Sequence, residues 1–270
     1  MTNEVRITGD VRITGDVRMT GEVRIEASPV GPVVHPPDPA GLVLVYLHGD
    51  RYLASSPESA LGLASNLAAR TGAVVVCPRY RCVFPAALED AHAGYRYGRE
   101  SAGPGGPGPV VVAGERLGAG LAAALLIRLR DEGASLPHGA VLVSALLDLS
   151  LEAPSLLLNQ AADPTFRLAE LRQRAARYTA GTAKNDPLLS PLHANLHGLP
   201  PIQLLAAGND VLVDDSLAFA TRAARSGVTV DLRVRSDEAG LRAGLAPAVA
   251  AFVGERAAQA AFLGRLTGEA

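Results

Sequence analysis

Residues 110–122 read VVVAGERLGAGLA, and this stretch decides the fold. Its small apolar residues predict a buried strand, and the glycines at 114 and 118 predict a sharp turn whose middle residue is Arg116. An Ala- and Leu-rich helix is predicted to follow over residues 117–130. A buried strand that turns sharply into a buried helix is typical of a parallel α/β sheet, in which ligands bind at the carboxyl ends of the strands.

The alternation of strands and helices continues on both sides of this stretch. Predicted strands cover residues 42–47, 73–77, 140–143, 201–205 and 228–234, and predicted helices cover residues 59–70, 85–97, 169–178 and 241–263. Most of these strands are continuous apolar runs, which indicates burial on both faces. The predicted fold class is therefore α/β, a mostly parallel doubly wound sheet with helices on both faces.

Composition excludes several classes of protein. The 270 residues are 48% hydrophobic and 19% charged, which is enough to bury a full core. A net charge of −2 argues against nucleic acid as a partner. No run reaches the roughly 18–20 apolar residues of a membrane span, and no secretory signal is visible, so no membrane and a cytoplasmic location are expected. Cys77 and Cys82 are too few for a disulfide framework.

The amino-terminal part of the chain is a short repeat. VRITGD occurs at residues 5–10 and 11–16, VRMTGE follows at 17–22, and the repeat fades into a last copy, VRIEAS, at 23–28. We expect residues 1–22 to be a loosely ordered extension that duplicates one edge strand, with an oligomerisation strand as the alternative. If the repeats form an oligomerisation strand, a second copy of the chain is expected as a partner. Residues 23–270 are expected to form one domain with a cap insertion at about 151–184.

Further motifs lie before and after the turn. YLHG stands at residues 46–49, FPAALEDA at 84–91, DPLLSPL at 186–192 and DVLVD at 210–214. In this order, and with the turn at 114–118, they resemble the hormone-sensitive-lipase-like branch of the α/β-hydrolase superfamily, which holds bacterial carboxylesterases. The resemblance runs from about residue 21 to 262. It implies an α/β-hydrolase fold with a small cap, and a serine, a histidine and an acid that together hydrolyse esters.

The residues at the three catalytic positions depart from the family pattern. Arg116 stands where the resemblance places the nucleophilic serine, and a guanidinium cannot attack an ester carbonyl. Gly240 aligns with the histidine base, and His197 is the last histidine of the chain. Asp210 keeps the position of the acid, but we expect it to be idle because no histidine is left for it to orient.

The turn after His48 differs as well. The resemblance implies three glycines there, whose backbone N–H groups stabilise a developing oxyanion. Only Gly49 remains, because Asp50 and Arg51 replace the next two. A carboxylate at this place would oppose the charge that such a site stabilises. The predicted binding residues of this turn and of the strand-to-helix turn are His48, Gly49, Asp50, Arg51, Glu115, Arg116 and Leu117.

These departures leave several functions open. Arg116 is expected either to pair with Asp50 or Asp210 and fill the old pocket, or to bind the carboxylate or phosphate of a small ligand. The preferred hypothesis is an inactive pseudo-hydrolase that binds a small ligand, such as one that bears a carboxylate, or a partner. One alternative is a non-hydrolytic enzyme, such as a lyase, dehydratase or cyclase on a polar metabolite. The other is a carboxylic ester hydrolase, as the resemblance implies.

The remaining reactive residue types suggest no other site. The histidines lack the spacing of metal ligands, so neither a metal nor a cofactor is expected. Cys82 has no histidine spaced to activate it, and we expect it to be a small core residue.

Overall fold

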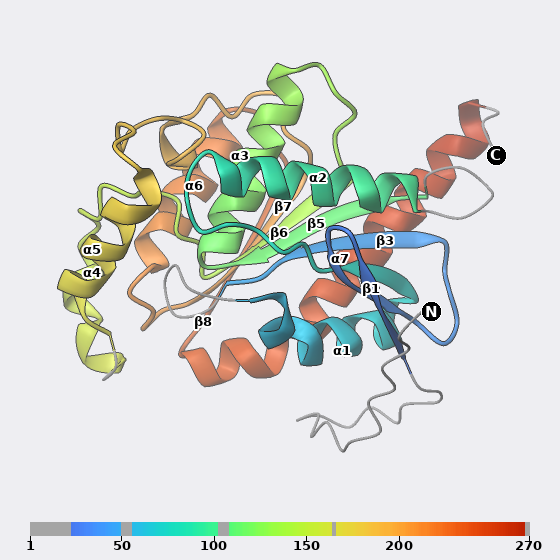
Figure 1. The fold of residues 1–270 in the computed structure, drawn as a ribbon, viewed down its shortest axis with the longest axis horizontal. Coiled ribbons are helices and arrows are strands. Elements are labelled where there is room, and N and C mark those ends of the chain that lie inside the picture. Colours follow the sequence, from blue (N-terminus) through green and yellow to red (C-terminus); the bar gives the residue numbers. More distant parts are fainter. Residues whose placement is uncertain (1–22, 50–55, 102–107, 164–165, 268–270) are drawn as a thin grey trace.

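The computed structural model describes residues 23–49, 56–101, 108–163 and 166–267, and its centre is an eight-stranded sheet (Figure 1). The strands lie in the order β1-β2-β4-β3-β5-β6-β7-β8. β2 is antiparallel to both of its neighbours, and the neighbours from β4 to β8 are parallel. The strands are Arg24–Ser28 (β1), Gly31–His35 (β2), Leu42–Leu47 (β3), Ala73–Val76 (β4), Val110–Glu115 (β5), Gly139–Val143 (β6), Ile202–Ala207 (β7) and Val230–Arg235 (β8).

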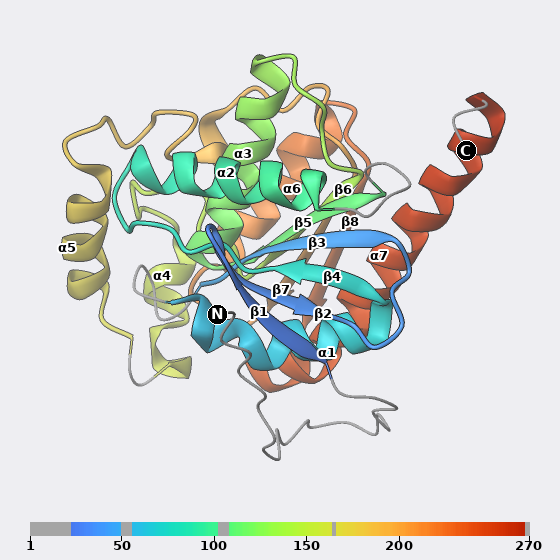
Figure 2. The same cartoon turned by 45° about the vertical axis from the view of Figure 1, so that its right-hand side comes forward.

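Helices cover both faces of this sheet. α2, α3 and α6 pack on one face and α1 and α7 on the other, while α4 and α5 (yellow) lie beyond one end of the strands (Figures 1 and 2). The α-helices are Leu61–Thr71 (α1), Ala86–Glu100 (α2), Leu117–Asp131 (α3), Ser155–Leu158 (α4), Leu168–Thr179 (α5), Val213–Arg225 (α6) and Glu238–Thr267 (α7). Short 3-10 helices cover Pro57–Ala60 (η1), Gln160–Ala162 (η2) and Pro191–His193 (η3).

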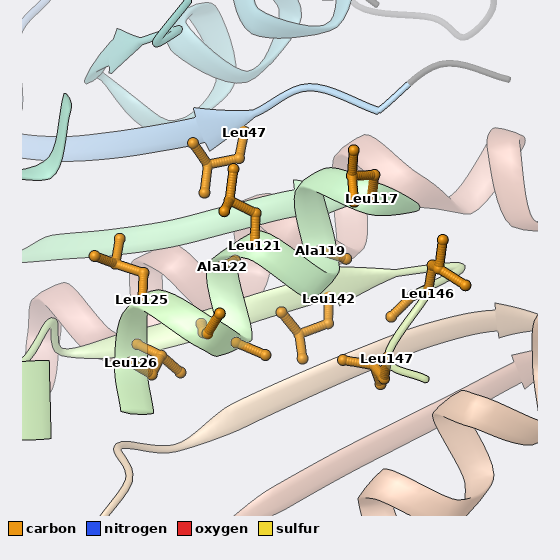
Figure 3. Close-up of a cluster of buried hydrophobic side chains, with 14 of the residues drawn as sticks. Leu47, Leu117, Ala119, Leu121, Ala122, Leu125, Leu126, Leu142, Leu146 and Leu147 are labelled. Atoms are coloured by element: carbon orange, nitrogen blue, oxygen red, sulfur yellow. The ribbon is translucent and has the colours of Figure 1, made fainter. Parts of the chain in front are cut away.

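The central strands are apolar throughout because they face a packed layer on each side. In β3, alternate side chains enter the two layers: Val43, Val45 and Leu47 pack with α2 and α3, and Leu42, Leu44 and Tyr46 pack with α1 and α7. α3 is buried on nearly every side, and Leu121 lies beside Leu47 of β3 (Figure 3). The beginning of α3 is therefore fixed against the middle of the sheet.

The predicted fold class is confirmed, and the structure adds elements that the sequence did not reveal. β2 and α6 were not predicted, and β1 contains the faded last copy of the repeat, whose earlier copies lie outside the described residues. α4, η2 and α5 fall within residues 151–184, whose role as a cap stays a prediction. In the part of the chain that the structure describes, no helix has the length and apolar character needed to cross a membrane.

Candidate functional site

The turn between β5 and α3 holds Arg116 in a conformation that few residues adopt. Its φ is 53° and its ψ is −114°, a left-handed backbone that costs a residue with a side chain about 1–3 kcal/mol. Hydrogen bonds to the segment around β6 hold it: Arg116 N–H donates to Val143 O at 2.9 Å, and Leu146 N–H donates to Arg116 O at 3.1 Å. The sharp turn predicted from the sequence is therefore present, with an arginine at its middle position.

Two glycines allow the chain to pack this closely around Arg116. A Cβ on Gly118 would lie less than 3.0 Å from the backbone of Leu47, and a Cβ on Gly49 would lie less than 3.0 Å from the backbone of Glu115. Real Cβ atoms essentially never come so close to a backbone oxygen. The end of β3 and the end of β5 therefore touch, which brings His48 and Gly49 beside the turn as predicted from their places at strand ends.

The guanidinium of Arg116 lies between two carboxylates from distant parts of the chain. Its Nη2 is 3.2 Å from Glu238 Oε1 at the start of α7, and its Nη1 is 3.8 Å from Asp210 Oδ1 in the loop after β7. The side chains of Arg116 and Asp210 are 10% and 4% exposed, whereas that of Glu238 is 40% exposed. A buried cation is tolerated when carboxylates compensate its charge, and this arrangement supplies them.

The loop that carries Asp210 is held in place from several directions. Leu212 N–H donates to Asp210 Oδ1 at 3.0 Å. The side-chain amide of Asn159, which follows α4, donates to the carbonyl oxygens of Gly208 and Asp210 at 3.1 and 2.8 Å. Asp210 Oδ2 is buried and has no hydrogen-bond partner in the described parts of the chain. Hydrogen bonds therefore hold Asp210 in place, while its Oδ2 makes none within the described residues.

Two aromatic residues complete the polar surroundings of the turn. The hydroxyl of Tyr46 donates to Glu115 Oε2 at 3.3 Å, and burial together with the nearby carboxylate raises the pKa of Tyr46 well above its usual value. The ring of His48 stacks on Tyr80 with 4.3 Å between centroids, and the Tyr80 hydroxyl donates to His48 O. These contacts anchor both tyrosines, and Tyr46 keeps its proton at physiological pH.

The structure brings together most of the residues that the sequence singled out. His48, Gly49, Glu115, Arg116, Leu117 and Asp210 gather at the ends of β3, β5 and β7, and Asp50 and Arg51 lie outside the described residues. Of the two expected partners of Arg116, only Asp210 can therefore be placed. Its separation from Arg116 is that of an ion pair without a close hydrogen bond.

Glu238 is the site residue that sequence reasoning missed. The sequence comparison after β8 aligned Gly240 with the histidine base. In the structure the backbone N–H of Gly240 donates to Asp237 Oδ1 at 2.7 Å in the first turn of α7. Because α7 begins at Glu238, three residues earlier than predicted, the Glu238 carboxylate reaches Arg116. The sequence did hold a signal for this start, an aspartate followed by a glutamate before an apolar run, which is typical of a helix amino terminus.

Other reactive groups do not form a comparable site. Within the described residues, no three His, Cys, Asp or Glu side chains are grouped as a metal site would require. The prediction that Cys82 is a core residue is wrong, because its side chain is exposed in the loop before α2. A surface cleft of about 610 Å³ lies between η3 and α6, and its Arg222 guanidinium is already bound to Ala194 O at 3.0 Å.

Comparisons with known proteins agree with this architecture. Residues 44–239 match the family model described as alpha/beta hydrolase fold. The chain is 42% identical over 201 residues to an acetyl-hydrolase of Streptomyces hygroscopicus, a match that covers 73% of this chain and 67% of that protein. It is 29% identical over 201 residues to an esterase of Acinetobacter venetianus, covering 71% of this chain and 64% of that protein.

A solved structure gives the same result. The crystal structure of an esterase from the bacterial hormone-sensitive lipase family superposes with a TM-score of 0.79 and 29% sequence identity. The superposition covers 89% of this chain and 87% of the other. The matches span about two thirds of the length of each of the two sequence relatives.

Proposed function

Since the chain belongs to the hormone-sensitive-lipase-like branch of the α/β-hydrolase family, we propose that it uses the family's strand-end site to bind a small carboxylate-bearing ligand rather than to hydrolyse an ester. Arg116 carries this proposal. It occupies the middle of the strand-to-helix turn, where the family resemblance places a serine, and its guanidinium is held at the ends of the strands.

The chemistry of the residues at the turn supports binding over hydrolysis. A guanidinium stays protonated at every physiological pH and has five N–H donors but no lone pair with which to attack a carbonyl. After His197 the sequence contains no histidine, so the segments that follow β7 and β8 offer no imidazole as a general base. General-base catalysis contributes about 10²–10⁴-fold, which is large enough for its loss to decide the rate.

The ligand class follows from the same group. A planar guanidinium binds a carboxylate through charge-assisted N–H···O bonds, which are about twice as strong as neutral ones. The contact that Glu238 makes with Arg116 Nη2 supports a carboxylate as the ligand group. The ligand carboxylate would take this position, and Asp210 would hold the guanidinium from its buried side.

Ester hydrolysis is the second candidate. The 42% identity to an acetyl-hydrolase favours it, because relatives this similar commonly share a reaction type. It would require a nucleophile from a segment other than the turn at 114–118. It would also require a different general base, because the chain has no histidine after His197. Asp210 would then retain a role in turnover, in contrast to the binding proposal.

One pair of assays separates the two candidates. Purified protein is incubated with a fluorophosphonate probe and with p-nitrophenyl acetate, and sodium acetate is titrated into a separate sample by calorimetry. The binding proposal expects no labelled serine, ester turnover at the background rate and acetate binding that Arg116→Ser abolishes. Labelling at a serine, with turnover that Asp210→Ala removes, would contradict it and establish the hydrolase.

A further inference from the structure

Glu238 connects Arg116 to a second arginine on the surface. Its Oε1 accepts from Arg116 Nη2 at 3.2 Å, and the same oxygen accepts from Arg242 Nη2 at 2.6 Å and from Arg242 Nε at 3.2 Å. Glu238 and Arg242 are one helical turn apart in α7, the spacing at which side chains of a helix meet. One carboxylate oxygen thus serves two guanidinium groups.

The exposures of the three side chains show which of them a solute would meet first. The Arg116 side chain is 10% exposed, that of Glu238 is 40% exposed and that of Arg242 is 69% exposed. The series runs from the interior to the surface, with Glu238 between the two cations. A small anion that approaches Arg116 along this series therefore encounters the carboxylate of Glu238 at the guanidinium it would bind.

We propose that Glu238 is an internal competitor that determines the specificity of the Arg116 site: it occupies Arg116 until an anionic group of a ligand replaces it. This inference rests on the proposed function, since it concerns the same ligand site. If a neutral ester or alcohol displaced Glu238, the buried guanidinium of Arg116 would lose one compensating negative charge. A ligand carboxylate supplies that negative charge again. Glu238 therefore selects anionic ligands.

Arg242 makes this exchange feasible. When Glu238 leaves Arg116, its Oε1 keeps both contacts to Arg242, so the displaced carboxylate remains in an ion pair. The ligand takes over the contact to Arg116, so every charge has a partner before and after the exchange. The position of Glu238 in the first turn of α7 adds to this, because the amino terminus of a helix stabilises a negative charge in either arrangement.

The test removes the carboxylate of Glu238, once with its shape kept (Glu238→Gln) and once with the side chain shortened (Glu238→Ala). Sodium acetate and sodium butyrate are titrated into the wild-type protein, Glu238→Gln and Glu238→Ala at constant ionic strength, and Kd is measured by calorimetry. Removing a competing charge-assisted contact that is partly exposed is expected to tighten carboxylate binding about tenfold in both variants. Acetamide is a neutral molecule of similar shape. Its affinity is expected to be no higher for the two Glu238 variants than for the wild-type protein.

Glu255→Gln is the matched control. Glu255 is an exposed residue of the same helix, and its nearest charged contact is Arg256, so the variant makes the same change in net charge away from Arg116. Its Kd for acetate is expected to stay within twofold of the wild-type value. If Glu255→Gln tightens binding as much as Glu238→Gln does, net charge explains the effect and the proposal is wrong.

The outcomes separate this inference from the proposed function. If acetate binds the wild-type protein, Arg116→Ser abolishes binding and Glu238→Gln leaves Kd unchanged or higher, then Glu238 is no competitor and this inference alone fails. If neither the wild-type protein nor the Glu238 variants bind a carboxylate, or if Arg116→Ser binds as well as the wild type, the proposed function fails. Circular dichroism and the melting temperature verify that each variant is folded.

Discussion

Arg116 combines the backbone of a sharp strand-to-helix turn with a long, charged side chain. The left-handed φ of 53° persists because the backbone of this residue is bonded to the segment around β6 on both sides. The side chain at position 116 therefore has little influence on whether the turn forms. Its influence is on what the ends of the strands can bind or transform.

Introducing a serine at this position tests whether the side chain of residue 116 alone decides between binding and hydrolysis. Arg116→Ser is expected not to produce an efficient esterase, because a hydroxyl without a general base stays a weak nucleophile. Turnover of p-nitrophenyl acetate is expected to match that of Arg116→Ala. This variant also lacks the guanidinium, but it has no hydroxyl. A rate more than about 100-fold above that of the alanine variant would show that a base is in place.

Gly118 illustrates the steric demand of the same turn. Gly118→Ala is expected to lower the free energy of unfolding by at least about 2 kcal/mol, because the new methyl group would overlap the backbone of Leu47. The matched control is Gly62→Ala in α1, where a Cβ would have no atom within 4 Å. There the same substitution is expected to stabilise the protein by up to about 1 kcal/mol. Urea denaturation of both variants measures the difference.

Helices and strands were predictable where burial leaves a simple pattern. β3, β5 and β6 were recognised because a strand packed on both faces must be apolar at every position. α6 was missed because its first residues were interpreted only as the motif around Asp210. The start of α7 was placed too late, since its first turn is polar and the apolar run begins at Leu241. That error hid Glu238.

Cys82 shows why local chemistry alone was insufficient. The residue follows a buried strand and carries a small apolar side chain, so burial was the simplest expectation. In the structure the chain has already left the sheet at this point, and Cys82 lies exposed in the loop before α2. Where a loop leaves the core depends on tertiary packing, which a run of neighbouring residues does not specify.

The first turn of α6 contains a buried carboxylate that should make stability depend on pH. Burial raises the pKa of Asp215 to about 7, against the opposing effect of backbone N–H groups from Leu147 and Asp148, which donate to its Oδ2 at 2.7 and 3.0 Å. The carboxyls of Asp148 and Asp214 raise it further. The hydrogen bonds of Asp215 connect α6 to the loop after β6, so its ionisation affects the packing of α6 against that loop.

The sign of the effect follows from the raised pKa. The folded protein holds a proton on Asp215 that the unfolded chain releases near pH 4, so the contribution to stability is present at acid pH and is lost as the pH rises through 7. By pH 8 the loss is expected to reach about 3–4 kcal/mol relative to pH 4. Chemical denaturation at a series of pH values measures it.

Asp215→Asn is expected to remove this dependence. The amide oxygen can accept both backbone N–H groups, since they meet at one oxygen of the carboxylate. The variant should therefore be more stable than the wild type at pH 8 and equally stable at pH 4. Asp131→Asn, at an exposed position, serves as the control and should keep the wild-type profile. An unchanged profile in Asp215→Asn would assign the pH dependence to other groups.

The two edges of the sheet differ in strand direction. On one side β1 and β2 form an antiparallel ribbon, and on the other β8 ends the parallel series. β1 begins at Arg24, so the edge strand of the described sheet lies within the last copy of the repeat. The earlier copies are therefore expected to add nothing to the stability of the domain.

Deleting residues 1–20 tests this expectation. The shortened chain is expected to melt within about 2 °C of the full chain, which corresponds to less than about 1 kcal/mol for a domain of this size. Scanning calorimetry gives the melting temperatures, and sedimentation velocity gives the mass of each form in solution. A fall of more than 5 °C, or a loss of oligomer on deletion, would support the alternative that the repeats form an oligomerisation strand.

The backbone bonds that fix the turn at Arg116 have a practical consequence for labelling. Because the flanking glycines and the segment around β6 determine its conformation, position 116 offers a defined attachment point at the ends of the central strands. A cysteine introduced there, with a spin label or fluorophore attached, would report from a backbone that hydrogen bonds hold on both sides. Changes in its signal could then be attributed to the surrounding loops, including the segment around Asp210, when solutes are added.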